Sequence, residues 1–101
     1  MTDFWVYMLR CADASYYVGH SDDLERRIAE HQSGTIPGHT RNRRPVTLAY
    51  SQSFPTRTEA LESERRIKGW RRAKKEALIA EDWDRISELA KRQTRSERTD
   101  T

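Results

Sequence analysis

The chain has a single cysteine, Cys11, among its 101 residues, which excludes an intramolecular disulfide and a cysteine-based zinc site. Its apolar residues never approach the run of roughly 18–20 that is needed to cross a bilayer. The opening residues include acidic Asp3 and have neither the basic segment nor the cleavage site of a secretory signal. We therefore expect one soluble domain in the reducing environment of the cytoplasm.

The net charge of +3 conceals an uneven distribution of charge along the chain. Residues 1–25 carry a net charge of −4, residues 26–75 carry +9, and residues 76–101 carry −2. A basic segment of this length is typical of proteins that bind the phosphates of a polyanion such as nucleic acid. A solvated basic face without a partner has the same composition, so charge alone leaves both interpretations open.

The first half of the chain has the pattern of a hairpin, a helix and a long loop. β-Branched and aromatic residues predict strands at residues 4–10 and 15–19, joined by a tight connection. Ser21 or Asp22 can cap the helix that follows, because acidic residues fill its first turn. Residues 33–45 contain glycine and proline without periodicity, which predicts a loop long enough to be functional.

The second half predicts one strand and then only helices. Residues 46–54 alternate apolar and polar side chains, as a half-buried strand does. The inward face of this strand is predicted to hold Val46, Leu48 and Tyr50. Thr56 and Glu59 form a capping box that opens the next helix. Helices are predicted over residues 57–70, over residues 72–81 and after Asp82.

This order of elements, β-β-α-β-α-α-α, indicates a small α+β fold. We expect a three-stranded sheet, antiparallel or mixed, that is flanked by helices. The ordered domain is predicted to cover residues 1–92. Residues 93–101 have no apolar side chain and are predicted to be a disordered polar tail.

Several residues with side chains that can take part in catalysis lie at positions where they could form a site. Tyr7 and Tyr17 belong to the two paired strands, where aromatic residues usually pack across a sheet. Arg27 and His31 are four residues apart, so they share one face of the predicted helix at the border of its apolar stripe. A solvated helix face is the usual interpretation of such a pair, but a polar group at that border is both oriented and reachable.

Glu64 is unusual because it falls within the apolar face of its helix. That face is marked by Ala60, Leu61, Ile67 and Trp70. Burial of an unpaired carboxylate costs several kcal/mol, so Glu64 needs a cation beside it. An arginine side chain and a metal ion both satisfy this requirement, and the sequence does not choose between them.

Together, these segments resemble the GIY-YIG nuclease superfamily. The likeness is carried by VYM at 6–8, YVG at 17–19, Leu24 and Arg27 on the next helix, and EALESE at 59–64. It extends over about residues 4–80. The sequence is most similar to the small stand-alone bacterial members and also resembles the nuclease domain of the excinuclease C subunit.

The resemblance implies a metal-dependent phosphodiesterase with defined roles for particular residues. By position, Tyr7 and Tyr17 correspond to the motif tyrosines, Arg27 to the helical arginine and Glu64 to the metal-binding glutamate. His31 lies one turn after the arginine, where His or Tyr is common. His20 follows YVG, where several members carry Lys. The chain differs from the family in having Trp5 at the first motif glycine, and Glu76 stands where a family asparagine is often found.

The implied activity is hydrolysis of phosphodiester bonds in DNA, in repair or processing, with one divalent cation, Mg²⁺ or Mn²⁺. Arg27 would bind a phosphate oxygen and Tyr17 would accept the proton of the attacking water, assisted by Tyr7 and His31. The alternative is a nucleic-acid-binding module with weak or no catalysis. Residues expected to contact DNA are His20, His39, Thr40, Arg41, Arg43, Arg44, Lys68, Arg71 and Arg72. The sequence leaves open whether the DNA is branched, flapped or single-stranded, and which oligomeric state the protein adopts.

Overall fold

The computed structural model describes residues 3–90. Two compact units follow one another along the chain, the first ending at Gly69 and the second beginning at Trp70. The tail predicted at residues 93–101 lies outside the described residues. No helix of the described residues is long and apolar enough to span a membrane.

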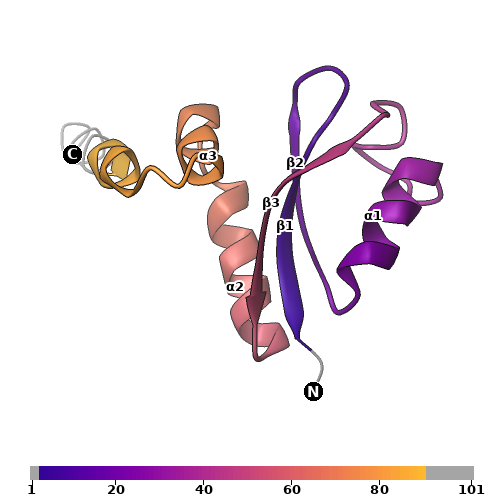
Figure 1. Ribbon diagram of the computed structural model, residues 1–101, viewed down its shortest axis with the longest axis horizontal. Helices are drawn as coiled ribbons and strands as arrows, with labels where there is room; N and C mark the ends of the chain where they lie inside the picture. Colours follow the sequence, from indigo (N-terminus) through magenta and orange to yellow (C-terminus); the bar gives the residue numbers. More distant parts are fainter. Residues whose placement is uncertain (1–2, 91–101) are drawn as a thin grey trace, which may run out of the picture. The chain divides into compact units, whose positions relative to one another are not determined.

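The first unit is built on a three-stranded sheet of β1 (Phe4–Arg10), β2 (Tyr16–Ser21) and β3 (Thr47–Phe54). The strand order is β2-β1-β3, and β1 pairs antiparallel with both neighbours (Figure 1). Of the two predicted sheet types, the antiparallel one is therefore confirmed, as is the α+β order of elements. Because β1 is central, its side chains are the most completely covered.

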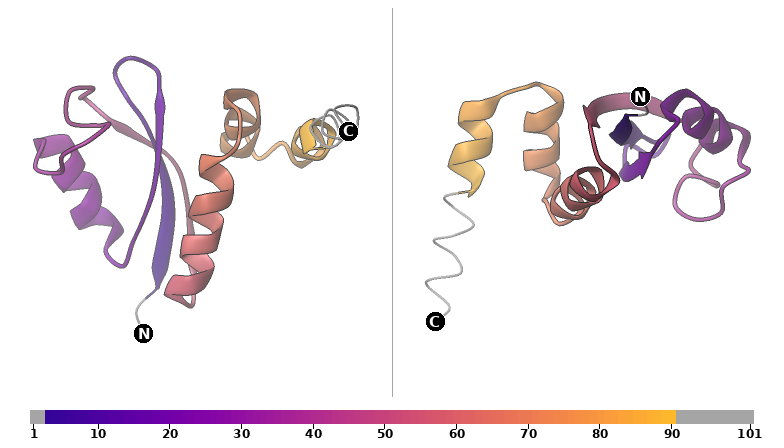
Figure 2. Two further views of the ribbon diagram at one scale, coloured as in Figure 1. Left: turned by 180° about the vertical axis from the view of Figure 1, so that it is seen from behind. Right: turned by 90° about the horizontal axis from the view of Figure 1, so that it is seen from below.

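The two faces of the sheet carry different residues because successive side chains of a strand point to opposite sides. One face holds Tyr7, Leu9 and Tyr17, and Leu24 and Ile28 of α1 (Leu24–Ser33) pack against it. The opposite face is covered by α2 (Arg57–Lys68), so the sheet lies between two helices (Figures 1 and 2). Val6, Met8 and Val18 are buried on this second face.

Helix α1 begins one or two residues later than predicted. Its cap is Asp23, whose carboxylate accepts a hydrogen bond from the backbone N–H of Arg26 at 3.2 Å. Ser21 does not cap the helix because its hydroxyl pairs with the backbone N–H and C=O of Asp23, at 3.0 Å each. The helix ends at Ser33 and is capped by Gly34, which has a φ of +78° that favours glycine.

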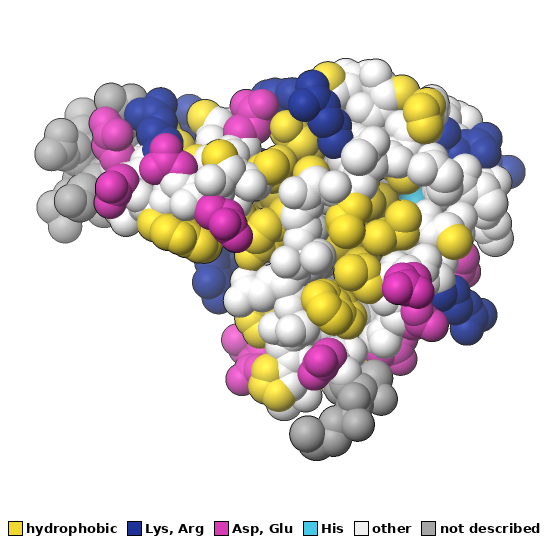
Figure 3. Space-filling model, in the orientation of Figure 1, with side chains coloured by type: hydrophobic (Ala, Val, Ile, Leu, Met, Phe, Trp, Pro, Cys, Tyr) yellow, Lys and Arg dark blue, Asp and Glu magenta, His cyan; other side chains and the backbone are white. Residues whose placement is uncertain are grey.

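Strand β3 differs from the predicted alternation because it contains a bulge. Leu48 pairs with Leu9 and Tyr50 pairs with Met8, so Ala49 is an extra residue on β3. Leu9 and Met8 point to opposite faces, and their partners therefore do so too. The prediction that Leu48 and Tyr50 share one inward face is wrong, and Leu48 is 41% exposed. Figure 3 shows hydrophobic side chains on the face that it draws, over the sheet and beside α1.

Helix α2 confirms the predicted capping, since Thr56 accepts a hydrogen bond from the backbone N–H of Glu59 at 3.2 Å. The helix stops at Lys68 rather than at Trp70. Trp70 therefore does not extend the buried face of α2; it begins the second unit, where Lys74 lies over its ring at 4.2 Å.

The second unit, described through residue 90, contains α3 (Arg72–Ile79) and a further helical segment at 83–90. Helix α3 ends two residues earlier than predicted, and Glu81 follows it with a φ of +56°. Asp82 caps the last segment, as predicted, by accepting from the backbone N–H of Arg85 at 3.1 Å.

Candidate active site

A chain of three buried polar side chains lies between the sheet and α1. The Tyr7 hydroxyl hydrogen-bonds Nε2 of His31 at 2.9 Å, and Nδ1 of His31 hydrogen-bonds the Thr40 hydroxyl at 2.7 Å. Each of the three residues is only 1% exposed. Because a buried polar group left unpaired costs about 1–3 kcal/mol, these groups stabilise the fold by satisfying one another.

Gly19 makes room for this arrangement. It pairs with Tyr7 across the hairpin, and a Cβ at position 19 would lie 2.6 Å from the Tyr7 hydroxyl oxygen and 2.7 Å from Cζ. Those separations are too short for any side chain. The glycine of YVG is therefore a steric requirement of the Tyr7 hydroxyl position, a role that the sequence motif marks but does not explain.

The surroundings of Tyr7 and His31 fix their protonation at neutral pH. Burial, followed by the nearby Tyr17, raises the pKa of Tyr7 well above its ordinary value, although Arg27 opposes this effect. Burial, followed by the positive charge of Arg27, lowers the pKa of His31, and Glu30 acts in the opposite direction. Tyr7 is therefore a neutral phenol and His31 a neutral imidazole at pH 7.

Tyr17 lies next to this buried chain but is only half-buried. Its ring centroid is 4.9 Å from that of His31 and 6.3 Å from that of Tyr7. The ring of His39 is stacked with that of Tyr17 at a centroid distance of 6.3 Å, and Nε2 of His39 hydrogen-bonds the hydroxyl of Ser15 at 2.8 Å. The rings of Tyr7, Tyr17 and His31 thus lie close together.

Arg27 carries the clearest sign of a missing partner. Among the described residues, its Nε is the buried side-chain nitrogen or oxygen that has no hydrogen-bond partner. A buried donor of a charged group that stays unpaired is costly, so this position favours an anionic ligand. The positive charge of Arg27 also acts on both neighbours: it opposes the rise in the pKa of Tyr7 and helps to lower the pKa of His31.

Glu64 is buried in the inward face of α2, as the periodicity predicted, and is 8% exposed. Within residues 3–90, Glu64 pairs with a histidine and a lysine rather than with an arginine. Oε1 lies 3.2 Å from Nδ1 of His20 on β2 and 3.6 Å from Nζ of Lys68 one turn later. The negative charge of Glu64 also contributes to raising the pKa of Tyr7, so it acts on the same site from the α2 side.

The donor set at Glu64 fits a divalent cation that takes most of its ligands from water and substrate. Within residues 3–90, no group of three or more His, Cys, Asp or Glu side chains is arranged to enclose a metal ion. A single carboxylate leaves positions for water and phosphate oxygens, which is how Mg²⁺ is commonly held in phosphate-processing sites.

The loop between α1 and β3 uses several of its polar groups internally. Thr40, expected at the DNA backbone, is buried against His31. Nε of Arg43 donates to Asp13 at 2.9 Å, and its NH1 donates to the backbone carbonyl of His39 at 2.7 Å.

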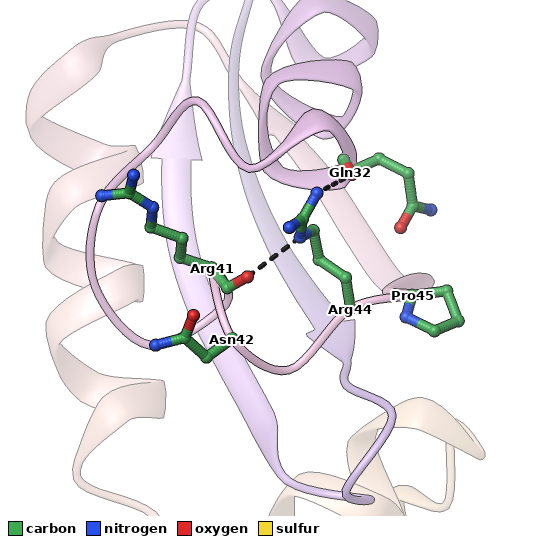
Figure 4. Close-up of a pocket in the computed structure, with 5 residues that line it drawn as sticks. All are labelled: Gln32, Arg41, Asn42, Arg44 and Pro45. Atoms are coloured by element: carbon green, nitrogen blue, oxygen red, sulfur yellow. Dashed lines mark hydrogen bonds between the residues drawn. The ribbon is translucent and has the colours of Figure 1, made fainter.

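Arg44 also bonds to the backbone. Nε of Arg44 donates to the backbone carbonyl of Arg41 at 2.9 Å, and its NH1 donates to that of Gln32 at 3.4 Å (Figure 4). These arginines line a shallow pocket whose residues are Gln32, Arg41, Asn42, Arg44 and Pro45. Lys68 lies on α2 beside Glu64, whereas Arg71 and Arg72 belong to the second unit.

Comparison with known proteins places this chain in a family. Residues 3–77 match the GIY-YIG catalytic domain. The chain is 48% identical to a UPF0213 protein of Halobacterium salinarum over 74 residues, which are 73% of this chain and 96% of that protein. It is 46% identical to a UPF0213 protein of Bacillus pumilus over 77 residues, covering 76% of this chain and 79% of the relative.

Two solution NMR structures share the fold. A UPF0213 protein from Bacillus halodurans is 40% identical with a TM-score of 0.52, and the match covers 77% of this chain and 83% of that one. A protein from E. faecalis is 35% identical with a TM-score of 0.56, covering 79% and 85%. The chain therefore belongs to the GIY-YIG nuclease superfamily, among the small stand-alone proteins named UPF0213.

Proposed function

We propose that this protein is a divalent-metal-dependent endonuclease that hydrolyses phosphodiester bonds in DNA. The observation that carries the proposal is the unpaired, buried Nε of Arg27, whose positive charge acts on the first motif tyrosine, Tyr7. A phosphate oxygen supplies the acceptor that this nitrogen lacks, and the planar guanidinium suits two-point binding of a phosphate.

Arg27 would hold the scissile phosphate and offset the charge that develops on its oxygens. Glu64 would hold the divalent cation, which, when bound, supplies Lewis-acid stabilisation of the leaving oxygen. Both groups lie close enough to Tyr7 to affect its pKa, which supports a common site.

Tyr17 is the stronger candidate to accept the proton of the attacking water. Tyr7 is 1% exposed and its hydroxyl is engaged with His31, whereas Tyr17 is half-buried and borders the same cluster. The Tyr7–His31 pair would then orient the neighbouring phenol. Proton transfer by a positioned side chain contributes about 10²–10⁴ in rate.

The basic loop and α2 would bind the DNA backbone. Arg41 and Lys68 are exposed, and phosphate contacts from such residues fix position without reading sequence. We therefore expect low sequence specificity, with branched, flapped or single-stranded DNA as substrate, and a role in DNA repair or processing in the cytoplasm.

The test is cleavage of labelled linear, flapped and branched DNA with Mg²⁺, Mn²⁺ or a chelator. We expect metal-dependent cleavage by the wild type and its loss in Glu64→Gln, with DNA binding retained. Glu62→Gln is the matched control, because Glu62 is exposed on the same helix and should leave the rate unchanged. Binding of DNA without cleavage under any metal would reject the nuclease and leave the alternative, a nucleic-acid-binding module.

A further inference from the structure

We propose that His20 is a second protein ligand of the divalent cation and shifts the metal preference of this site away from Mg²⁺. This inference rests on the proposed function, because it places the cation at Glu64. The two residues come from elements far apart in sequence: His20 is on the edge strand β2 and Glu64 is on α2.

The separation of the two donor atoms fits a shared ion. Nδ1 of His20 lies 3.2 Å from Oε1 of Glu64. Two adjacent ligands around a divalent ion, with bonds of about 2.1 Å, lie about 3.0–3.4 Å apart for octahedral or tetrahedral angles. A cation can therefore bind both atoms with little movement of either side chain.

The accessibility of the pair also suits a metal site that is open to substrate. The Glu64 side chain is 10% exposed and that of His20 is 25% exposed, so both are oriented by the fold while one side remains reachable. Lys68 is the other basic side chain near Glu64, but its ammonium is 3.6 Å away on a side chain that is 53% exposed. It can move into water when an ion enters.

The chemistry of an imidazole ligand determines the expected selectivity. Mg²⁺ prefers oxygen ligands, whereas Mn²⁺, Co²⁺ and Zn²⁺ accept a neutral imidazole together with carboxylate and water. A site made of one His and one Glu should therefore bind Mn²⁺ and Zn²⁺ more tightly than Mg²⁺. If Glu64 were the only ligand, replacement of His20 would leave this order unchanged.

The experiment uses the full chain without DNA and with each metal alone. Calorimetric titration with Zn²⁺, Mn²⁺ and Mg²⁺ would compare the wild type with His20→Asn, His20→Lys and Glu64→Gln. We expect both His20 variants to bind Zn²⁺ and Mn²⁺ about tenfold or more weakly, since even outer-shell changes commonly cost 10- to 100-fold. Mg²⁺ affinity should change much less.

Imidazole ¹⁵N spectra provide a readout that is independent of affinity. The chain has three histidines, so their signals can be assigned by substitution. Zn²⁺ should shift Nδ1 of His20 and leave His39, which is stacked on Tyr17, unchanged. Unperturbed backbone spectra of the two His20 variants would show that they remain folded.

The outcomes separate this inference from the proposed function. If Glu64→Gln abolishes binding while both His20 variants bind Zn²⁺ and Mn²⁺ like the wild type, the second ligand is refuted and the metal at Glu64 stands. If Glu64→Gln also binds normally, the metal assignment of the proposed function fails. A Zn²⁺-induced shift at His39 instead of His20 would also overturn the inference.

Discussion

Replacement of Thr40 by valine tests the buried chain of hydroxyls and imidazole most directly. The substitution keeps the branched shape of the side chain and removes the hydroxyl that lies 2.7 Å from Nδ1 of His31. With both residues 1% exposed, water has no access to the vacated position. His31 then keeps a buried ring nitrogen without a partner.

The expected magnitude follows from that unpaired nitrogen. A buried polar group that loses its partner costs about 1–3 kcal/mol. For a domain of this size, 1 kcal/mol lowers Tm by about 4–8 °C, so the effect is measurable. Thr40→Ser retains the hydroxyl and should recover most of the loss. Thr47→Val, at an exposed position of β3, should change the free energy of unfolding by less than about 0.5 kcal/mol.

Urea unfolding monitored by circular dichroism measures the free energy, and ¹⁵N NMR of His31 monitors its tautomer. We expect the tautomer populations of His31 to change in Thr40→Val and to return in Thr40→Ser. A Thr40→Val protein with wild-type stability and unchanged His31 shifts would refute the reasoning, because the hydroxyl would then contribute nothing to holding the ring.

Four further predictions concern the same region. Gly19→Ala should destabilise the fold by about 1–3 kcal/mol in the urea unfolding assay, because its Cβ would lie 2.6 Å from the Tyr7 hydroxyl oxygen. Gly69→Ala is the control and should be nearly neutral, because its Cβ would meet no atom closer than 3.6 Å. The folded state lowers the pKa of His31, so the unfolded state binds protons more readily. The free energy of unfolding should therefore keep the full contribution of His31 above about pH 6.5 and should decrease as the pH falls below that value. A free energy of unfolding that stays constant in urea titrations from pH 5 to 8 would contradict this. The pKa of Tyr7 is raised, so stability should also decline above about pH 10. Tyr17→Phe should keep its circular dichroism spectrum and cleave DNA about 10²-fold more slowly, and an unchanged rate would transfer the role of base to Tyr7 or His31.

The order of elements could be predicted from the sequence because it depends on local signals. The capping box of Thr56 and Glu59 and the aromatic character of residues 4–10 act within a few residues, and the structure agrees with both. The apolar periodicity around Glu64 likewise predicted a buried carboxylate. The motif residues near Tyr7 and Tyr17 indicated the family, which the comparisons confirm.

The register between strands and the hydrogen-bond partners of individual side chains were decided only by the tertiary structure. The bulge at Ala49 turns Leu48 and Tyr50 to opposite faces, and it arises from the register of β3 on β1 rather than from the alternation of β3 itself. Arg43 was expected to contact DNA, but its partner Asp13 is 30 residues away in sequence, so no local pattern could reveal the salt bridge.

In the candidate site, too, some features could be predicted from the sequence and others depend on the tertiary structure. Residue types and spacing were enough to select Tyr7 and Glu64, because motif and periodicity are properties of the sequence. They could not show that Thr40 is buried against His31, or that His20 of β2 contacts Glu64 of α2. Those contacts depend on the hairpin register and on how a helix packs against the sheet, and such long-range geometry exists only once the chain has folded.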